Sequence, residues 1–108
     1  MTKDQWTKSL SGILKECLGL EDQLEDINNA NKTSSRASLA QTRSELISIE
    51  KNIPAGHEYQ QIHQLVSAVC TDCTQIQKTL FSDPPKTEGA IKSFQQNIGG
   101  LRKHFIAL

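Results

Sequence analysis

Cys70 and Cys73 have the C-x-x-C spacing that metal sites and thiol exchange both use, because two sulfur atoms three residues apart can hold one ion or form one disulfide. The surrounding pattern argues against both uses. The pair lies in the middle of an apolar stripe with helical spacing, whereas the dipole that lowers a thiol pKa acts at a helix N-terminus, and no βα pattern precedes the pair. We therefore interpret the two cysteines as small buried side chains.

A zinc or iron site would need further ligands, and Cys17 and His63 are the only plausible additions to the cysteine pair. No second pair of residues has the spacing of metal ligands, and none of the three histidines lies in a motif typical of phosphoryl relay. We expect neither a metal nor a cofactor. A small-ligand or metal-binding bundle that uses Cys17, Cys70, Cys73 and His63 is the alternative to the function preferred below.

The sequence lacks the arrangements that hydrolysis and nucleotide chemistry need. No serine lies in a nucleophile-elbow context, and the glycines form neither G-x-x-x-x-G-K-[ST] nor G-x-G-x-x-G. No two carboxylates share an apolar face, where burial could set their pKa values apart for acid–base catalysis. We expect that the chain is not an enzyme and assign no catalytic residue.

Four apolar stripes with the alternating three- and four-residue steps of a helix organise the chain. They predict helices at residues 3–28, 35–53, 56–82 and 84–106, and the third stripe keeps a coiled-coil-like heptad spacing throughout. In chain order the stripes are Trp6, Leu10, Ile13, Cys17, Leu20, Leu24 and Ile27; Leu39, Thr42, Leu46, Ile49 and Ile53; Tyr59, Ile62, Val66, Val69, Cys73, Ile76 and Leu80; and Ile91, Phe94, Ile98, Leu101, Phe105 and Leu108.

Helix-end signals separate the stripes. Thr2 and Gln5 have capping-box spacing, the polar segment 28–35 breaks the pattern and ends in N-cap candidates, and Asp83 can cap a helix that has Pro84 in its first turn. Short connections make successive helices antiparallel neighbours, so we predict one all-α domain, residues 1–108, folded as an up-down-up-down four-helix bundle. The second stripe has few apolar residues. The alternative fold is therefore two helical hairpins whose cores are completed only when two chains form a dimer.

Charge is balanced over the whole chain, with 12 basic and 12 acidic residues. The four helical segments are net negative, positive, negative and positive in turn, which favours a bundle in which each helix borders two of opposite sign. The balance leaves no basic field for nucleic acid, and no apolar run approaches the ~20 residues of a membrane helix. The N-terminus lacks the apolar part of a signal peptide and the cysteines are odd in number, so we expect a cytoplasmic protein with reduced thiols.

The outer faces of the third and fourth predicted helices are poor in charge, as the centres of protein interfaces are. The first two helices carry most of the acidic and many of the basic residues and resemble a solvent-facing side. We predict that a partner binds the side formed by helices three and four. The predicted contact residues are Gln64, Leu65, Thr71, Gln75, Ser93, Gln96, Gly99 and Gly100.

Gly99 and Gly100 lie together inside the last predicted helix, where each costs about 1 kcal/mol relative to alanine. Three explanations compete: the pair kinks the helix, ends it, or lets another helix approach the backbone closely. The acidic run at residues 21–26 is interpreted as a solvated face, with a landing site for a basic partner as the alternative.

The preferred hypothesis is a non-catalytic protein–protein interaction module. Small adaptors, assembly factors, secretion-type chaperones and inhibitors are the classes considered, and each is a fold-level analogy, since no residue motif singles one out. The expected partner is another protein or a second copy of this chain, as a homodimer. Neither nucleic acid nor membrane insertion is expected.

Overall fold

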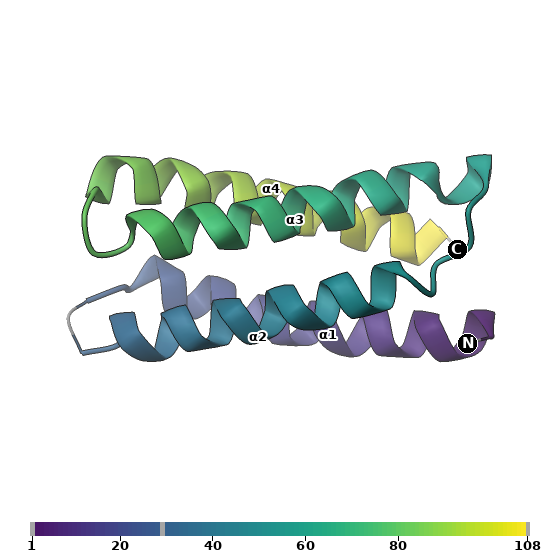
Figure 1. Ribbon diagram of the computed structural model, residues 1–108, viewed down its shortest axis with the longest axis horizontal. Helices are drawn as coiled ribbons and strands as arrows, with labels where there is room; N and C mark the ends of the chain where they lie inside the picture. Colours follow the sequence, from purple (N-terminus) through teal and green to yellow (C-terminus); the bar gives the residue numbers. More distant parts are fainter. Residues whose placement is uncertain (1, 29, 108) are drawn as a thin grey trace.

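The computed structural model describes the backbone of residues 2–28 and 30–107, with side chains through His104. It contains four α-helices and one short 3-10 turn. These are α1 (Lys3–Glu25), α2 (Lys32–Glu50), η1 (His57–Tyr59), α3 (Gln60–Thr79) and α4 (Pro84–Ala107). Two helical hairpins, α1–α2 and α3–α4, stack with their loops at one end of a rod that measures 41 × 20 × 20 Å (Figure 1).

Each helix packs against two others, with contacts between consecutive helices and between α1 and α4. The diagonal pairs, α1–α3 and α2–α4, have no Cα atoms within 8 Å of one another in the part of the chain that the structure describes. The protein is therefore an up-down four-helix bundle, and the predicted fold class is confirmed. The α3–α4 contact is the most extensive of the four, and the α1–α4 contact is the least.

Two predicted helix starts are present with their hydrogen bonds. The Thr2 hydroxyl accepts a bond from the Gln5 backbone N–H at 3.3 Å, and the Gln5 side chain accepts one from the Thr2 N–H at 2.9 Å. This reciprocal capping box satisfies two donors that the first turn of α1 would leave open. At α4, Asp83 accepts from the Lys86 N–H at 3.3 Å, and Pro84 begins the helix as expected.

The second helix begins three residues before its predicted start at residue 35. Asparagine side chains close the preceding loop early: Asn28 Oδ1 accepts from the Ala30 N–H at 2.8 Å, and Asn31 Oδ1 accepts from the Asn28 N–H at 2.8 Å. Asn31 is the N-cap residue of α2, but its side chain makes no capping hydrogen bond to the helix. The loop is thus confined to a few residues by local asparagine bonds, which the general helix-start rules did not predict.

The other boundaries are shifted by a few residues. α1 ends at Glu25 rather than residue 28, and α2 ends at Glu50 rather than 53, yet Ile53 is still buried. The third predicted helix begins with the 3-10 turn η1, and α3 itself spans Gln60–Thr79. Such shifts are normal at frayed ends, where 3-10 bonds replace α-helical ones.

The predicted stripes form one continuous core. Every stripe residue with a described side chain is buried, except Ile27, Tyr59 and Ile91, which are half-buried at its margins. Thr42 is buried with its stripe, and Leu14 is an additional core residue. Each fully buried leucine, isoleucine or phenylalanine contributes about 1.5–3 kcal/mol, so this core supplies the main driving force for folding. Phe105 and Leu108 lie outside the described side chains.

The helices are neighbours in the order that alternating charge favours, but cross-helix ion pairs are scarce. Among the described residues, the only pair of a basic and an acidic side chain within 4 Å of each other on different helices is His63 Nδ1 and Glu50 Oε1, at 3.8 Å, and it is an ion pair only when His63 is protonated. The other two pairs, Lys86–Asp83 and Lys92–Glu88, lie within α4 and are exposed. Short loops and apolar stripes therefore account for the arrangement, and exposed ion pairs contribute little.

Candidate functional site

The predicted cysteine cluster is a set of buried thiols. Cys17 and Cys73 are fully buried, and burial is the largest cause that raises the pKa of each thiol to about 12. Burial also raises the pKa of Cys70, which is only half-buried. A raised pKa keeps the sulfur protonated near pH 7, so these thiols are poor nucleophiles.

His63 does not join the cysteines. Its Nε2 lies 3.1 Å from the carbonyl oxygen of Pro54, and its Nδ1 faces Glu50. Within the described residues, no three His, Cys, Asp or Glu side chains are grouped so that they could hold a metal ion. The structure therefore gives no support to the alternative site built on these four residues.

The predicted contact residues on α3 and α4 divide into two sets. Five have an outward position: Gln64, Thr71, Gln75 and Gln96 are exposed, and half-buried Gly99 has open space where a Cβ would be. The other three, Leu65, Ser93 and Gly100, face the seam between the two helices. The predicted surface is thus partly used for packing inside the bundle.

The Gly99–Gly100 pair was explained from the sequence as a kink, a helix end or a site of close helix approach. α4 continues through both glycines to Ala107, so they do not end the helix. A Cβ at Gly100 would lie 3.4 Å from Leu65 Cδ2, at the edge of ordinary van der Waals contact. Gly100 therefore lies against α3 of the same chain, although a Cβ at this position would make an ordinary contact with Leu65.

A buried carboxylate joins α3 to α4. Asp72 is 7% exposed; its Oδ1 accepts a hydrogen bond from Ser93 Oγ at 2.8 Å, and its Oδ2 accepts one from Asn97 Nδ2 at 2.7 Å. The two donors are four residues apart on α4 and so share one face of that helix. Asp72 was not among the residues singled out from the sequence. Its position beside the stripe residue Cys73 was the available signal.

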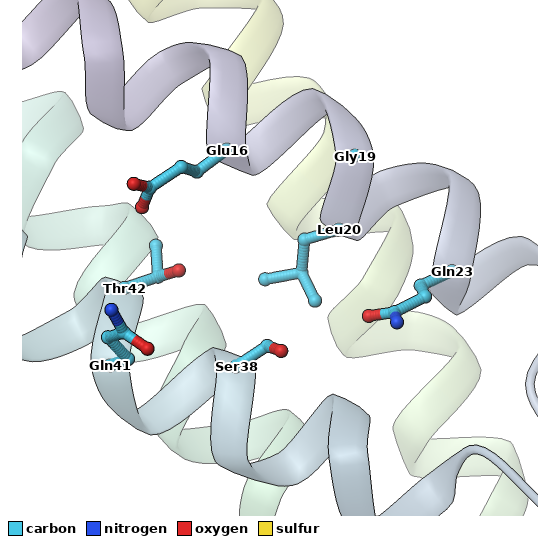
Figure 2. Close-up of a pocket in the computed structure, with 7 residues that line it drawn as sticks. All are labelled: Glu16, Gly19, Leu20, Gln23, Ser38, Gln41 and Thr42. Atoms are coloured by element: carbon cyan, nitrogen blue, oxygen red, sulfur yellow. The ribbon is translucent and has the colours of Figure 1, made fainter.

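The seam between α1 and α2 is hollow. Near the loop end of the hairpin, a hollow of about 400 Å³ is lined by Glu16, Gly19, Leu20, Gln23, Ser38, Gln41 and Thr42. Figure 2 shows Glu16 and Leu20 reaching from α1, and Ser38 and Thr42 reaching from α2, on the two sides of the hollow. Leu20 and Thr42 are buried and form the floor.

A second hollow continues along the same seam toward the chain termini. It has a volume of about 360 Å³ and is lined by Ser9, Gly12, Ile13, Glu16, Glu45, Ser48, Ile49 and Asn52. Glu16 lines both hollows. We call the two hollows together the α1–α2 groove.

The groove walls follow helical spacing on both helices. On α1 the wall residues are Ser9, Gly12, Glu16, Gly19 and Gln23, and on α2 they are Ser38, Gln41, Glu45, Ser48 and Asn52. Both sets advance by three and four residues alternately, which places each on one face of its helix beside the apolar stripe. Small and polar side chains at these positions leave the seam open.

Two glycines widen the groove without serving the packing of the chain itself. A Cβ built on Gly12 or Gly19 would meet nothing within 4 Å. Gly100 on α4 differs, since Leu65 occupies the space beside it. Neither α1 glycine has a positive φ, so the backbone conformation does not require glycine there.

Two carboxylates face one another at the middle of the groove. A side-chain hydrogen bond with Glu45 is the largest cause that raises the pKa of Glu16, and burial and the charge of Glu45 add to it. Gln41 Nε2 donates a hydrogen bond to Glu45 Oε1 at 3.2 Å. The helical spacing of either helix alone does not reveal this pair, because its two carboxylates come from different helices.

A third hollow, of about 470 Å³, lies between the C-terminal end of α1 and the N-terminal half of α4. Its apolar lining includes Leu24, Ile27, Leu80 and Ile91, while its rim carries Glu25, Lys32, Glu88 and Lys92. The rim has both charge signs in equal number, so it does not indicate the charge of an occupant. Nearby, exposed Phe81 lies under the cations of Lys32 and Arg36, at 5.8 and 5.6 Å from the ring centroid.

Comparison with models of known families, with curated proteins and with solved structures found no match to this chain. In the described part of the chain, no helix combines the length and the apolar character needed to cross a membrane.

Proposed function

We propose that the protein is a non-catalytic interaction module that holds a helix of another protein in the α1–α2 groove. The observation that carries the proposal is the pair of hollows along this seam, bounded on α1 by glycines with open space beside them. A helix laid into a groove between two others is a recurring mode of protein recognition.

The two glycines support this use because they are unfavourable for the isolated chain. Glycine inside a helix costs about 0.5–1 kcal/mol relative to alanine, and neither Gly12 nor Gly19 gains a packing contact in return. Small residues on a helix face permit another helix to approach closely. A docked partner would give these positions the packing contacts that the chain alone does not.

The α3–α4 face is the competing surface. Its exposed residues, Gln64, Thr71, Gln75 and Gln96, are uncharged, but three of the eight residues first predicted to bind are engaged in the seam between α3 and α4. A face whose seam is filled offers a flatter surface than an open groove. We therefore place the partner on α1–α2, in a cytoplasmic setting, and keep the α3–α4 face as the alternative.

Leucine substitutions at glycines with open space distinguish the two surfaces. Gly12→Leu with Gly19→Leu fills the groove, Gly99→Leu obstructs the α3–α4 face, and Gly89→Leu on α4 is a matched control. All four sites are helical and uncrowded, and leucine favours helix, so the fold should persist and circular dichroism should show unchanged helicity.

The readout is affinity purification from the native host with mass spectrometry. We expect that one partner co-purifies with the wild type and with the Gly89→Leu and Gly99→Leu variants. The same partner should be absent from the Gly12→Leu/Gly19→Leu purification. Loss only with Gly99→Leu would place binding on α3–α4 and contradict the proposal. Stoichiometric metal in the purified protein would instead favour the alternative based on the cysteines and His63.

A further inference from the structure

The charge of the α1–α2 groove restricts what can occupy it. Of all residues that line its two hollows, only Glu16 and Glu45 carry a formal charge, and both are acidic. Glu16 lines both hollows and Glu45 lies beside it, so the pair lies where the two hollows meet. No lysine or arginine of the described chain lines the groove to neutralise them.

The length of the groove sets the size of the occupant. Its wall on α1 runs from Ser9 to Gln23, and its wall on α2 runs from Ser38 to Asn52. At a rise of about 1.5 Å per residue, each wall is roughly 21 Å long, which corresponds to four turns of a docked helix. A helix of that length would place its central turn against the two glutamates.

We propose that the α1–α2 groove receives an amphipathic helix of another protein that carries a lysine or arginine in its central turn, between Glu16 and Glu45. Small or slender side chains one to two turns away would enter the two hollows. The inference rests on the proposed function and adds the chemistry of the partner. A cation at the centre would remove the repulsion between the carboxylates and replace their lost solvation by charge-assisted hydrogen bonds.

A second copy of this chain does not fit the same place. A symmetric dimer brings the same surface patch of both copies together. If that patch were the groove, four carboxylates would meet at the centre, with no lysine or arginine among the lining residues of either copy. Like charges brought together in this way disfavour a wrong partner, so the groove discriminates against self-association.

The test uses a display library of 15-residue helical peptides with randomised groove-facing positions, selected against the full-length protein at pH 7. The footprint of each selected peptide is mapped by NMR shifts of the Gly12 and Gly19 amides. We expect peptides that bind the groove and that share a central lysine or arginine. Titration calorimetry should show about tenfold weaker binding to Glu16→Gln/Glu45→Gln.

Glu88→Gln is the matched control, because Glu88 is an exposed glutamate on α4 that pairs with Lys92 of the same helix and does not line the groove. It should bind the selected peptides as wild type does. Groove-binding peptides without a central cation, or equal affinity for the double glutamine variant, would overturn the inference while leaving the proposed function intact.

Selected peptides that all bind elsewhere, or a library that yields no binder at all, would reject both the inference and the proposed function. A wild-type dimer at pH 7 whose interface maps to the groove would contradict the exclusion of a second copy. Sedimentation equilibrium reports whether a dimer forms, and the NMR shifts of the Gly12 and Gly19 amides report whether its interface lies in the groove; we expect no dimer through the groove.

Discussion

The outer seams of the two hairpins are built from the same kind of helix but filled differently. Between α3 and α4, Asp72 bonds to Ser93 and Asn97, and Leu65 lies against Gly100. Between α1 and α2, the corresponding space is a groove with glutamates at its centre. The apolar stripe holds each hairpin together, and the residues beside the stripe decide whether its outer seam is closed or open.

Carboxylates have different surroundings in the two seams. On the α3–α4 side, a carboxylate meets donors from its own chain, which ties two helices in one register. On the α1–α2 side, the carboxylate of Glu16 faces a second carboxylate, that of Glu45. Asp72, which has hydrogen-bond donors from its own chain, stabilises the fold. The Glu16–Glu45 pair has no cation beside it among the described residues that line the groove, so a basic partner would add favourable interaction energy.

The largest effect is expected from Asp72→Ala. It removes the acceptor of two half-buried donors on α4, and leaving such groups unpaired should lower the free energy of unfolding by about 2 kcal/mol. Urea denaturation measures the loss. Glu45→Ala is the control, since it removes a carboxylate from the open seam and should cause no loss. Equal destabilisation by the two variants would break the contrast between the seams.

An intermediate effect of opposite sign is expected at the α1 glycines. Gly12→Ala and Gly19→Ala should each raise the free energy of unfolding by roughly 0.5–1 kcal/mol, because alanine favours helix and its Cβ meets nothing. Gly100→Leu should destabilise instead, as the larger side chain would collide with Leu65. Thermal unfolding of the three variants is the measurement; a loss at either α1 glycine would mean that the seam is closed in solution.

The smallest effect concerns the glutamate pair. Glu45→Gln should raise stability at pH 7 by a few tenths of a kcal/mol, the scale of exposed charge pairs. Because the pKa of Glu16 is raised in the folded protein, folding binds its proton more tightly, and the repulsion acts fully above that raised pKa. It fades as pH falls toward the ordinary value of 4.5. Urea titrations should therefore show the gain at pH 7 and its disappearance near pH 4; a gain that persists there would contradict this assignment.

The fold was largely predictable because its causes are local. The three- and four-residue steps of the stripes, the Thr2–Gln5 capping box and the Asp83–Pro84 helix start all depend on neighbours within a few residues. Chain connections of a few residues then leave little choice of topology. The early start of α2 escaped prediction because asparagine side chains, rather than the expected cap residues, close its loop.

The site was less predictable because it depends on register between helices. A stripe of Ser9, Gly12 and Gly19 beside the apolar stripe was visible in the sequence, but its depth depends on how far apart α1 and α2 lie. Likewise, nothing in either helix alone places Glu16 opposite Glu45. The partner surface predicted on helices three and four was inferred from charge alone, which does not reveal that Ser93 turns toward Asp72.

The walls of the α1–α2 groove present nearly the same groups in both directions. Ser9 and Asn52 line one hollow, Ser38 and Gln23 line the other, and the glutamates lie between. Because α1 and α2 are antiparallel, a visiting helix would meet serine, glutamate and amide in similar order whichever end it entered from. These polar groups can therefore set the position of such a helix along the bundle but not its polarity. The two walls differ at Gly12 and Gly19 of α1, whose counterparts on α2 are Gln41 and Ser48, so orientation would have to come from these positions or from contacts at the two unlike ends of the rod (Figure 1).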